Sequence, residues 1–257
     1  MAAQLIASDK RNCKCNEVQL GLINTVVKIT QDIHHMNKAT YLLSTIGKKQ
    51  IMALAGLALC GFVLTHAVGN LFLFVSPEAY NHYGHAITSN PLIYLAEVGL
   101  VVFFAFHVVA GVLVTIRNMA SRPQKYAVSS SGDKATSLTT KTMAIQGMVL
   151  FGFIVLHLIT FKYGASYPAQ ADGVAVRDLF RLVYEVFQDP IYVFGYIACL
   201  LVLSFHLSHG LASSLQTLGL HHPKYTEKLK IASILYGVLV AGIFISQPLY
   251  MYFIYKG

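Results

Sequence analysis

Five stretches of the sequence are long and apolar enough to cross a lipid bilayer, and they restrict the fold more than any other feature. The first contains no charged side chain from Gln50 to Pro77. A helix needs about 20 mostly apolar residues to span the hydrocarbon core, and it satisfies its own backbone groups there. The sequence therefore predicts an all-α integral membrane bundle of five transmembrane helices. They cover residues 50–75, 92–116, 142–161, 190–218 and 231–255, of which the second contains Glu97.

Composition excludes the main alternatives to a helical membrane bundle. Hydrophobic residues make up 55% of the 257 residues, and charged residues make up only 12%. A soluble domain of this size needs more polar surface than that. A membrane β-barrel would show segments of about ten residues in which apolar and polar side chains alternate, and the sequence shows no such segments.

The distribution of lysine and arginine predicts how the chain is oriented. Fifteen of the 19 basic residues fall in the N-terminal arm and in the loops 117–141 and 219–230. Because cytoplasmic loops are enriched in Lys and Arg, we expect a cytoplasmic N-terminus and an outside C-terminus. The net charge of +8 follows mostly from this asymmetry, so it requires no nucleic-acid partner. We expect a multi-pass protein of the bacterial cytoplasmic (inner) membrane, with a cytoplasmic extension over 1–45 and a membrane domain over 46–257.

Histidines inside the predicted spans are the strongest functional signal. There are five of them, and each of the first four spans has at least one: His66, His107, His157, His206 and His209. Ionisable residues at membrane depth are rare and usually functional, although a single histidine can also serve only to hydrogen-bond across helices. Histidines in four successive spans favour haem ligation instead, because neutral imidazole binds haem iron well.

The depth of these histidines sorts them into two layers. His66 lies 17 residues beyond Lys49, and His157 lies 16 beyond Lys141, so both are about 25 Å from the cytoplasmic ends of their spans. His107 and His209 are about 15 Å from that side. We predict that His66 and His157 hold an outer haem and that His107 and His209 hold an inner one. His206 is one turn from His209, and depth alone does not exclude it.

Three segments of the sequence resemble one known family. STIGKKQIMALAGL (44–57), HAVGNLFLFVSPEAYNHYGH (66–85) and HLSHGLASSLQTLGLHHPKY (206–225) are similar to the dihaem cytochrome b membrane anchor of succinate dehydrogenases and fumarate reductases. The closest class has a single five-helix anchor subunit. The resemblance covers about residues 36–257. MNKATYLLSTIGKKQ also resembles the usual beginning of the family, which makes Met36 a candidate for the true start.

The resemblance implies two b haems with four axial histidines. The positions that match are His66, His107, His157 and His209, because the family's fourth-span ligand directly precedes a glycine. It also implies a flavoprotein subunit and an iron–sulfur subunit as partners. Succinate would be oxidised on another subunit, and this chain would be the non-flavin membrane subunit of a succinate:quinone oxidoreductase. Electrons would pass through the haems to a membrane quinone, with menaquinone favoured over ubiquinone.

Other polar residues are weaker candidates for the quinone and haem sites. Glu97 lies ten residues to the outer side of His107 and could supply protons to a quinone, or it could be a helix-end carboxylate near headgroups. His82 and His85 lie in the outer loop beside Glu97 and could line a quinone pocket, and a plain interfacial loop is the alternative. Arg117 could pair with a haem propionate or anchor the inner interface. Some family members carry a glutamate as a proton route where this chain has Leu207, so that route is not expected here.

Two other functions remain open at this point. One is the b-type cytochrome anchor of another quinone-linked enzyme, such as a membrane formate dehydrogenase or hydrogenase. The segment 206–225 argues against it. The other is a transporter whose membrane histidines bind no haem. Such a protein is expected to show broken helices or internal repeats near the midplane, and the sequence shows neither.

Overall fold

The computed structural model describes residues 38–121, 138–171 and 173–256. The chain divides into a short N-terminal unit that ends at Gly47 and a larger unit that starts at Lys48. Within the first unit, the short helix α2 spans Lys38–Leu43. Most of the extension predicted over residues 1–45 lies outside the described residues, as does the candidate start at Met36, so both stay predictions.

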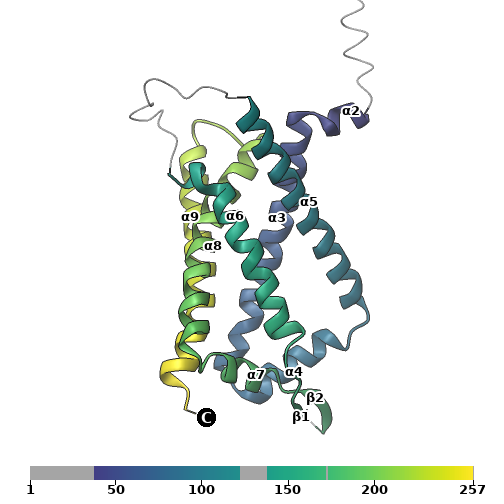
Figure 1. Ribbon diagram of the computed structural model, residues 1–257, viewed down its shortest axis with the longest axis vertical. Helices are drawn as coiled ribbons and strands as arrows, with labels where there is room; N and C mark the ends of the chain where they lie inside the picture. The colour runs from purple at the N-terminus through teal and green to yellow at the C-terminus, as the bar shows by residue number, and fades with distance from the viewer. Residues whose placement is uncertain (1–37, 122–137, 172, 257) are drawn as a thin grey trace, which may run out of the picture. The chain divides into compact units, whose positions relative to one another are not determined.

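The predicted bundle of five transmembrane helices is confirmed (Figure 1). The second span, α5, covers Leu92–Ala120, and the fourth, α8, covers Pro190–Thr217. The other three continue into a turn of different pitch. They are α3 (Thr45–Asn70) with the 3₁₀ turn η1 (Leu71–Phe74), α6 (Leu138–His157) with the π turn η3 (Leu158–Lys162), and α9 (Thr226–Leu249) with the π turn η4 (Tyr250–Ile254).

The second and fourth spans begin at the predicted residues, 92 and 190, whereas several other limits differ by one to five residues. The last span starts at Thr226 and includes Lys228 and Lys230, whereas the sequence predicted a start at residue 231. Lysine does not end a helix, because its long stem can lie along apolar surface while its amine reaches water. The end of α8 follows a clear local signal. Gly219 has a φ of +93°, and Leu220 N donates to Leu215 O at 3.0 Å, which is the pattern of a glycine-terminated helix.

Small residues allow the helices of the larger unit to pack closely. A Cβ on Gly237 of α9 would lie 2.6 Å from the carbonyl oxygen of Ser204 on α8, so only glycine fits this crossing. Ala67 of α3, Leu207 of α8 and Val240 of α9 form a buried cluster. The outward surface is strongly apolar: Leu95 is 71% exposed and Ile191 is 80% exposed, as expected for a face covered by lipid.

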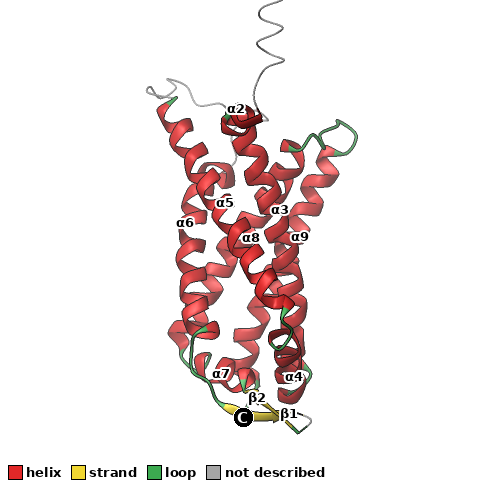
Figure 2. Ribbon diagram, turned by 90° about the vertical axis from the view of Figure 1, so that its right-hand side faces the viewer, coloured by secondary structure: helices red, strands yellow, loops and turns green. Residues whose placement is uncertain are grey.

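The two connections at one end of the bundle are folded rather than irregular. The first forms α4 (Pro77–Thr88). The second forms the antiparallel hairpin β1 (Pro168–Ala171) and β2 (Val174–Arg177), followed by α7 (Leu179–Val186). Figure 2 shows the hairpin at the same end as α4 and α7. We call residues 77–88 and 168–186 together the cap. If the predicted orientation holds, the cap lies on the outer side.

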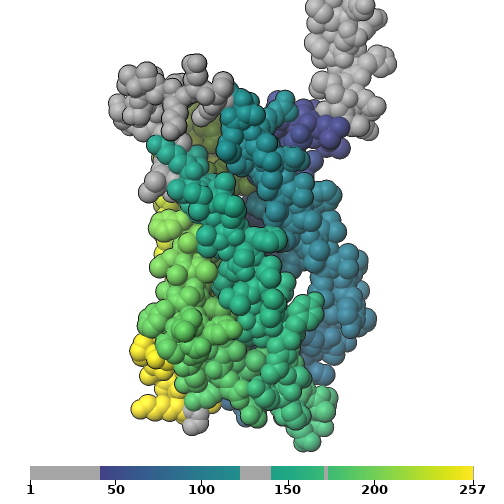
Figure 3. Space-filling view, in the orientation of Figure 1, coloured from purple at the N-terminus to yellow at the C-terminus, as the bar shows by residue number. Residues whose placement is uncertain are grey.

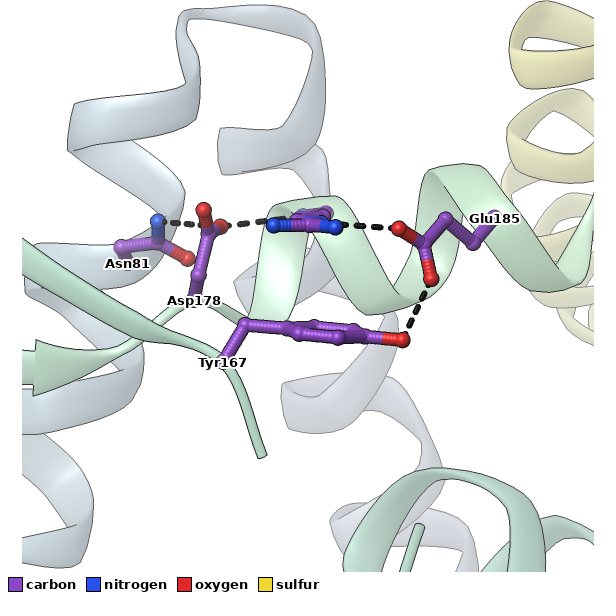
Figure 4. Close-up of polar contacts among 5 residues, drawn as sticks. Asn81, Tyr167, Asp178 and Glu185 are labelled. Atoms are coloured by element: carbon purple, nitrogen blue, oxygen red, sulfur yellow. Dashed lines mark hydrogen bonds and ion pairs between the residues drawn. The ribbon is translucent and has the colours of Figure 1, made fainter. Parts of the chain in front are cut away.

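A buried amide holds the two halves of the cap together. Asn81 of α4 is only 6% exposed. Its Nδ2 donates to Asp178 Oδ1 at 2.8 Å (Figure 4). Its Oδ1 accepts from Phe180 N at 2.9 Å. Asp178 also caps α7 by accepting from Arg181 N at 3.0 Å. Because an unpaired buried amide is costly, this arrangement fixes α7 against α4.

A second, exposed network braces the hairpin against α7. Arg181 lies over the ring of Tyr167, 4.2 Å from its centre, and donates from Nε to Glu185 Oε1 at 2.8 Å. The hydroxyl of Tyr167 donates to Glu185 Oε2 at 2.5 Å (Figure 4). These hydrogen bonds, from Tyr167 first and then Arg181, lower the pKa of the Glu185 carboxyl. Arg177 closes the end of η3 by donating to three carbonyl oxygens, those of Lys162, Gly164 and Ala165, at 2.8–3.2 Å.

Candidate cofactor site

The structure brings together the two histidines predicted to form the outer layer. The rings of His66 on α3 and His157 on α6 have centroids 5.9 Å apart and planes at 84°. Two imidazoles bound on opposite sides of one metal ion, each by a bond of about 2 Å, have ring centres about 6 Å apart. The separation of His66 and His157 therefore fits a centre with two axial histidines.

Aromatic side chains surround this pair. His66 stacks on Phe62 at a centroid distance of 5.5 Å and lies 5.6 Å from Phe244 of α9. His157 has Phe161 at 5.3 Å and Tyr196 at 6.3 Å. Such apolar walls exclude water and keep the local dielectric low, which suits a redox cofactor. The π turn η3 starts directly after His157, and turns of this kind are rare and often accompany functional sites.

His107 on α5 is held by the backbone of α3. Its Nδ1 lies 3.1 Å from the carbonyl oxygen of Met52. A carbonyl can only accept, so Nδ1 carries the proton and Nε2 is left free as a ligand atom. Histidines that bind metals commonly have this support on the second ring nitrogen. Gly56 makes room for the ring, because a Cβ there would lie 3.1 Å from Cε1 and 3.2 Å from Nδ1 of His107.

Helix α8 offers two histidines as possible partners of His107. One is closer to His107, and the other has a hydrogen-bond partner for its second ring nitrogen. His206 is the one brought opposite, with ring centroids 6.1 Å apart and planes at 77°. Its Nδ1, however, is buried and has no hydrogen-bond partner among the residues that the structure describes. His209 does have a partner for its second ring nitrogen, since its Nδ1 lies 3.5 Å from Thr140 Oγ1 of α6. The sequence prediction of His209 therefore stays a prediction.

Each of these close pairs could offer two imidazole ligands to one cofactor. In the described parts of the chain, no group of three or more His, Cys, Asp or Glu side chains is placed to hold a metal. A haem needs only two protein ligands, because the macrocycle supplies the others. The structure brings His66 close to His157 and His107 close to His206, and histidine is a common protein ligand of haem iron.

The other predicted residues fall in different places. Glu97 forms an ion pair with Lys162, and both side chains are about 40% exposed. Glu97 lies in the first turns of α5, and Lys162 ends η3. In the space-filling view an opening separates part of α5 from α6 (Figure 3). His82 and His85 belong to α4 in the cap. Arg117 lies in the last turns of α5, at the opposite end of that helix from Glu97. Arg117 therefore does not share a site with Glu97, from which it is separated by most of the length of α5.

Sequence reasoning missed two contributors to the site. Tyr80 of α4 donates to Asn70 Oδ1 at 2.9 Å, and Asn70 in turn lies against His66. Met52 supplies the carbonyl oxygen for His107. The pairing of Asn70 with His66 follows from their spacing of four residues on one helix. Nothing in the sequence indicates Tyr80 or Met52, because their roles depend on how separate helices pack.

The fold is that of an integral, multi-pass membrane protein with histidine pairs between its spans. Comparison with known proteins does not narrow this class, because no protein-family model, curated protein or solved structure matches the chain.

Proposed function

We propose that this chain is the cytochrome b membrane anchor of a succinate dehydrogenase or fumarate reductase in the bacterial cytoplasmic membrane. It would bind two b haems and work with an iron–sulfur subunit and a flavoprotein subunit, which carries the succinate site. The observation that supports it most is the approach of His66 to His157 across two spans, at the separation that a shared metal ion requires. When bound, the haems would supply one-electron transfer between the iron–sulfur subunit and a quinone, with menaquinone favoured.

The residues of this chain would hold and shield the cofactors. His66 and His157 would bind the two faces of one haem, with Phe62 and Phe244 keeping water from the His66 side. His107 would bind the second haem through Nε2, since Met52 occupies its other ring nitrogen. Arg117 is proposed to meet a propionate at the inner end.

We propose His209 as the partner of His107. Ligation by His206 through Nε2 would leave a buried N–H without an acceptor, at a cost of about 1–3 kcal/mol. His209 has Thr140 beside its Nδ1. A Cβ at the following residue, Gly210, would meet nothing within 4 Å, so the helix surface there is open to a planar group.

The quinone site is proposed near Glu97, with His82 and His85 as further candidates. The ion pair of Glu97 with Lys162 supports a role in which the lysine orients the carboxylate. A carboxylate held in this way could accept a proton released by quinol oxidation or return one on quinone reduction.

Haem content is the direct test of this proposal. Reduced-minus-oxidised spectra and pyridine haemochrome assays on the purified membrane complex are expected to give two b haems per chain. A content of one haem per chain would be compatible with electron transfer but would contradict the arrangement of two haems in two layers. No haem in an assembled preparation would overturn the proposal and favour a transporter whose histidines bind no cofactor.

Replacing Gly56 with valine is expected to displace His107 and weaken binding of the second haem. The new side chain would press on the imidazole and break its hydrogen bond to Met52. Loss of such support typically weakens metal binding about 10- to 100-fold. Gly61→Val is the matched control on the same helix, because a Cβ there meets nothing within 4 Å. Equal haem content in the two variants would contradict this role of Gly56.

A further inference from the structure

Two polar side chains are buried in the bundle with a polar atom that lacks a hydrogen bond. Gln247 of α9 is 7% exposed, and Tyr196 of α8 is 5% exposed. Among the residues that the structure describes, neither Gln247 Nε2 nor the Tyr196 hydroxyl makes a hydrogen bond of normal geometry, although Thr160 of η3 lies beside the hydroxyl. Buried polar groups are nearly always paired, and water is scarce at membrane depth, so these two groups call for an explanation.

The two residues lie at the same level of the bundle. Gly237 of α9 packs against Ser204 and Ser208 of α8, and the two helices run antiparallel because they are consecutive spans. Tyr196 lies ten residues before the midpoint of the two serines, and Gln247 lies ten residues after Gly237. Both are therefore about 15 Å from this crossing, on the side of the cap.

This level adjoins the close pair of His66 and His157. Phe244 precedes Gln247 by three residues and shares its face of α9. The ring of Phe244 lies 5.6 Å from that of His66, and the ring of Tyr196 lies 6.3 Å from that of His157. The two unpaired groups therefore belong to the surroundings of the pair: Tyr196 is directly beside His157, and Gln247 is one turn beyond the contact with His66.

The partner that these groups lack is a hydrogen-bond acceptor. The amide nitrogen of Gln247 can only donate, and the phenol of Tyr196 is a donor as well. Ligand sites are typically apolar cavities in which a few polar groups orient the bound molecule. Here the apolar wall is aromatic, since Phe161 lies 5.9 Å from Tyr196 and Phe244 precedes Gln247. Two donors in such a wall suit an oxygen atom at the edge of a mostly apolar ligand.

We propose that Gln247 and Tyr196 form a polar subsite that binds an acceptor oxygen of a redox cofactor beside His66 and His157. The inference rests on the proposed function and adds two binding residues to it. A quinone carbonyl and a haem propionate share the required chemistry, because each presents an oxygen that accepts hydrogen bonds at the edge of a flat ring system. The experiment below distinguishes these two sources.

Gln247→Met and Tyr196→Phe test the subsite in the full membrane complex. Each variant replaces a donor by an apolar group of similar size, so the packing is kept. Two properties are measured for each: equilibrium binding of radiolabelled menadione, a naphthoquinone without a lipid tail, and the midpoint potentials of the haem bands. If the subsite binds a quinone carbonyl, the Kd of menadione should rise about fivefold in each variant, the usual effect of one lost hydrogen bond, and both haem potentials should stay unchanged.

If the subsite binds a haem propionate, the potential of one haem should fall, because the negative charge of the propionate is then less well compensated and favours the oxidised iron. Menadione binding should then match the wild type. Ser246→Ala is the matched control. Ser246 adjoins Gln247, but its hydroxyl donates to Ile243 O of its own helix at 2.7 Å, so neither property should change.

The inference is overturned if both variants keep the wild-type menadione Kd and both wild-type haem potentials, which would leave a buried water as the partner of the two donors. A wild-type complex without haem would instead refute the proposed function itself. If Gln247→Met does not assemble, Tyr196→Phe decides, because it removes a single oxygen atom and keeps the aromatic ring.

Discussion

Replacing His157 with alanine is expected to remove one of the two b haems and leave the other with an unchanged spectrum. His157 faces His66 across the bundle, and a haem that loses one of two axial imidazoles loses much of its binding free energy. His66→Ala should remove the same haem, so the two variants should have matching residual spectra. His107→Ala should leave the complementary spectrum, because we propose that His107 binds the other haem.

The measurement is haem content per chain combined with low-temperature difference spectra of the purified complex. His222→Ala serves as the control, since His222 is an exposed histidine in the connection between α8 and α9. It should retain both haems. Loss of the same haem in His66, His107 and His157 variants would contradict the assignment to two layers. Full retention in His66→Ala and His157→Ala would remove the main support for a haem between α3 and α6.

Separate alanine variants of His206 and His209 are expected to give opposite results. His209→Ala should lose the haem that His107→Ala loses, because we propose the two as its axial pair. His206→Ala should keep both haems, with at most a spectral shift from the changed packing beside His107. The histidines are one turn apart, about 4.5 Å along the helix, so either could reach a cofactor at this level.

The reverse outcome would identify His206 as the ligand. The 6.1 Å approach of its ring to His107 would then have been a better guide than the hydrogen bonding of the second ring nitrogen. Retention of both haems in both single variants would mean that either histidine can replace the other. The double variant would settle that case, since it should lose the inner haem only if α8 supplies a ligand at all.

The sequence predicted the spans well because the physical requirement is simple. A run such as Gln50 to Pro77 must be helical in a bilayer, whatever its neighbours do. The approach of His66 to His157 followed from depth, since both lie a similar distance along straight helices from the same membrane face. Depth has a resolution of about one turn, however, so it could not separate His206 from His209.

The remaining features depend on contacts between distant parts of the chain. The sequence analysis treated the connection with His82 and His85 as an outer loop and predicted no structure for 168–186. The described residues form α4, a hairpin and α7, and Asn81 of α4 is bonded to Asp178, 97 positions away. The partnership of Glu97 with Lys162 also links separate spans. Short segments of this kind carry weak local signals, and packing decides their structure. The orientation in the membrane stays a prediction from the distribution of basic residues.

The π turn after His157 has a consequence for how this part of the chain can vary in length. A π turn corresponds to an α-helix into which one extra residue has been inserted. Arg177 holds the segment beyond it through three carbonyl oxygens, so that segment stays fixed to the hairpin. Deleting one residue from Leu158–Lys162 could therefore be absorbed by a return to α-helical pitch, without rotating His157 by the roughly 100° that one residue represents. The turn would therefore allow the chain between α6 and the cap to shorten by one residue while the side chain of His157 keeps its direction.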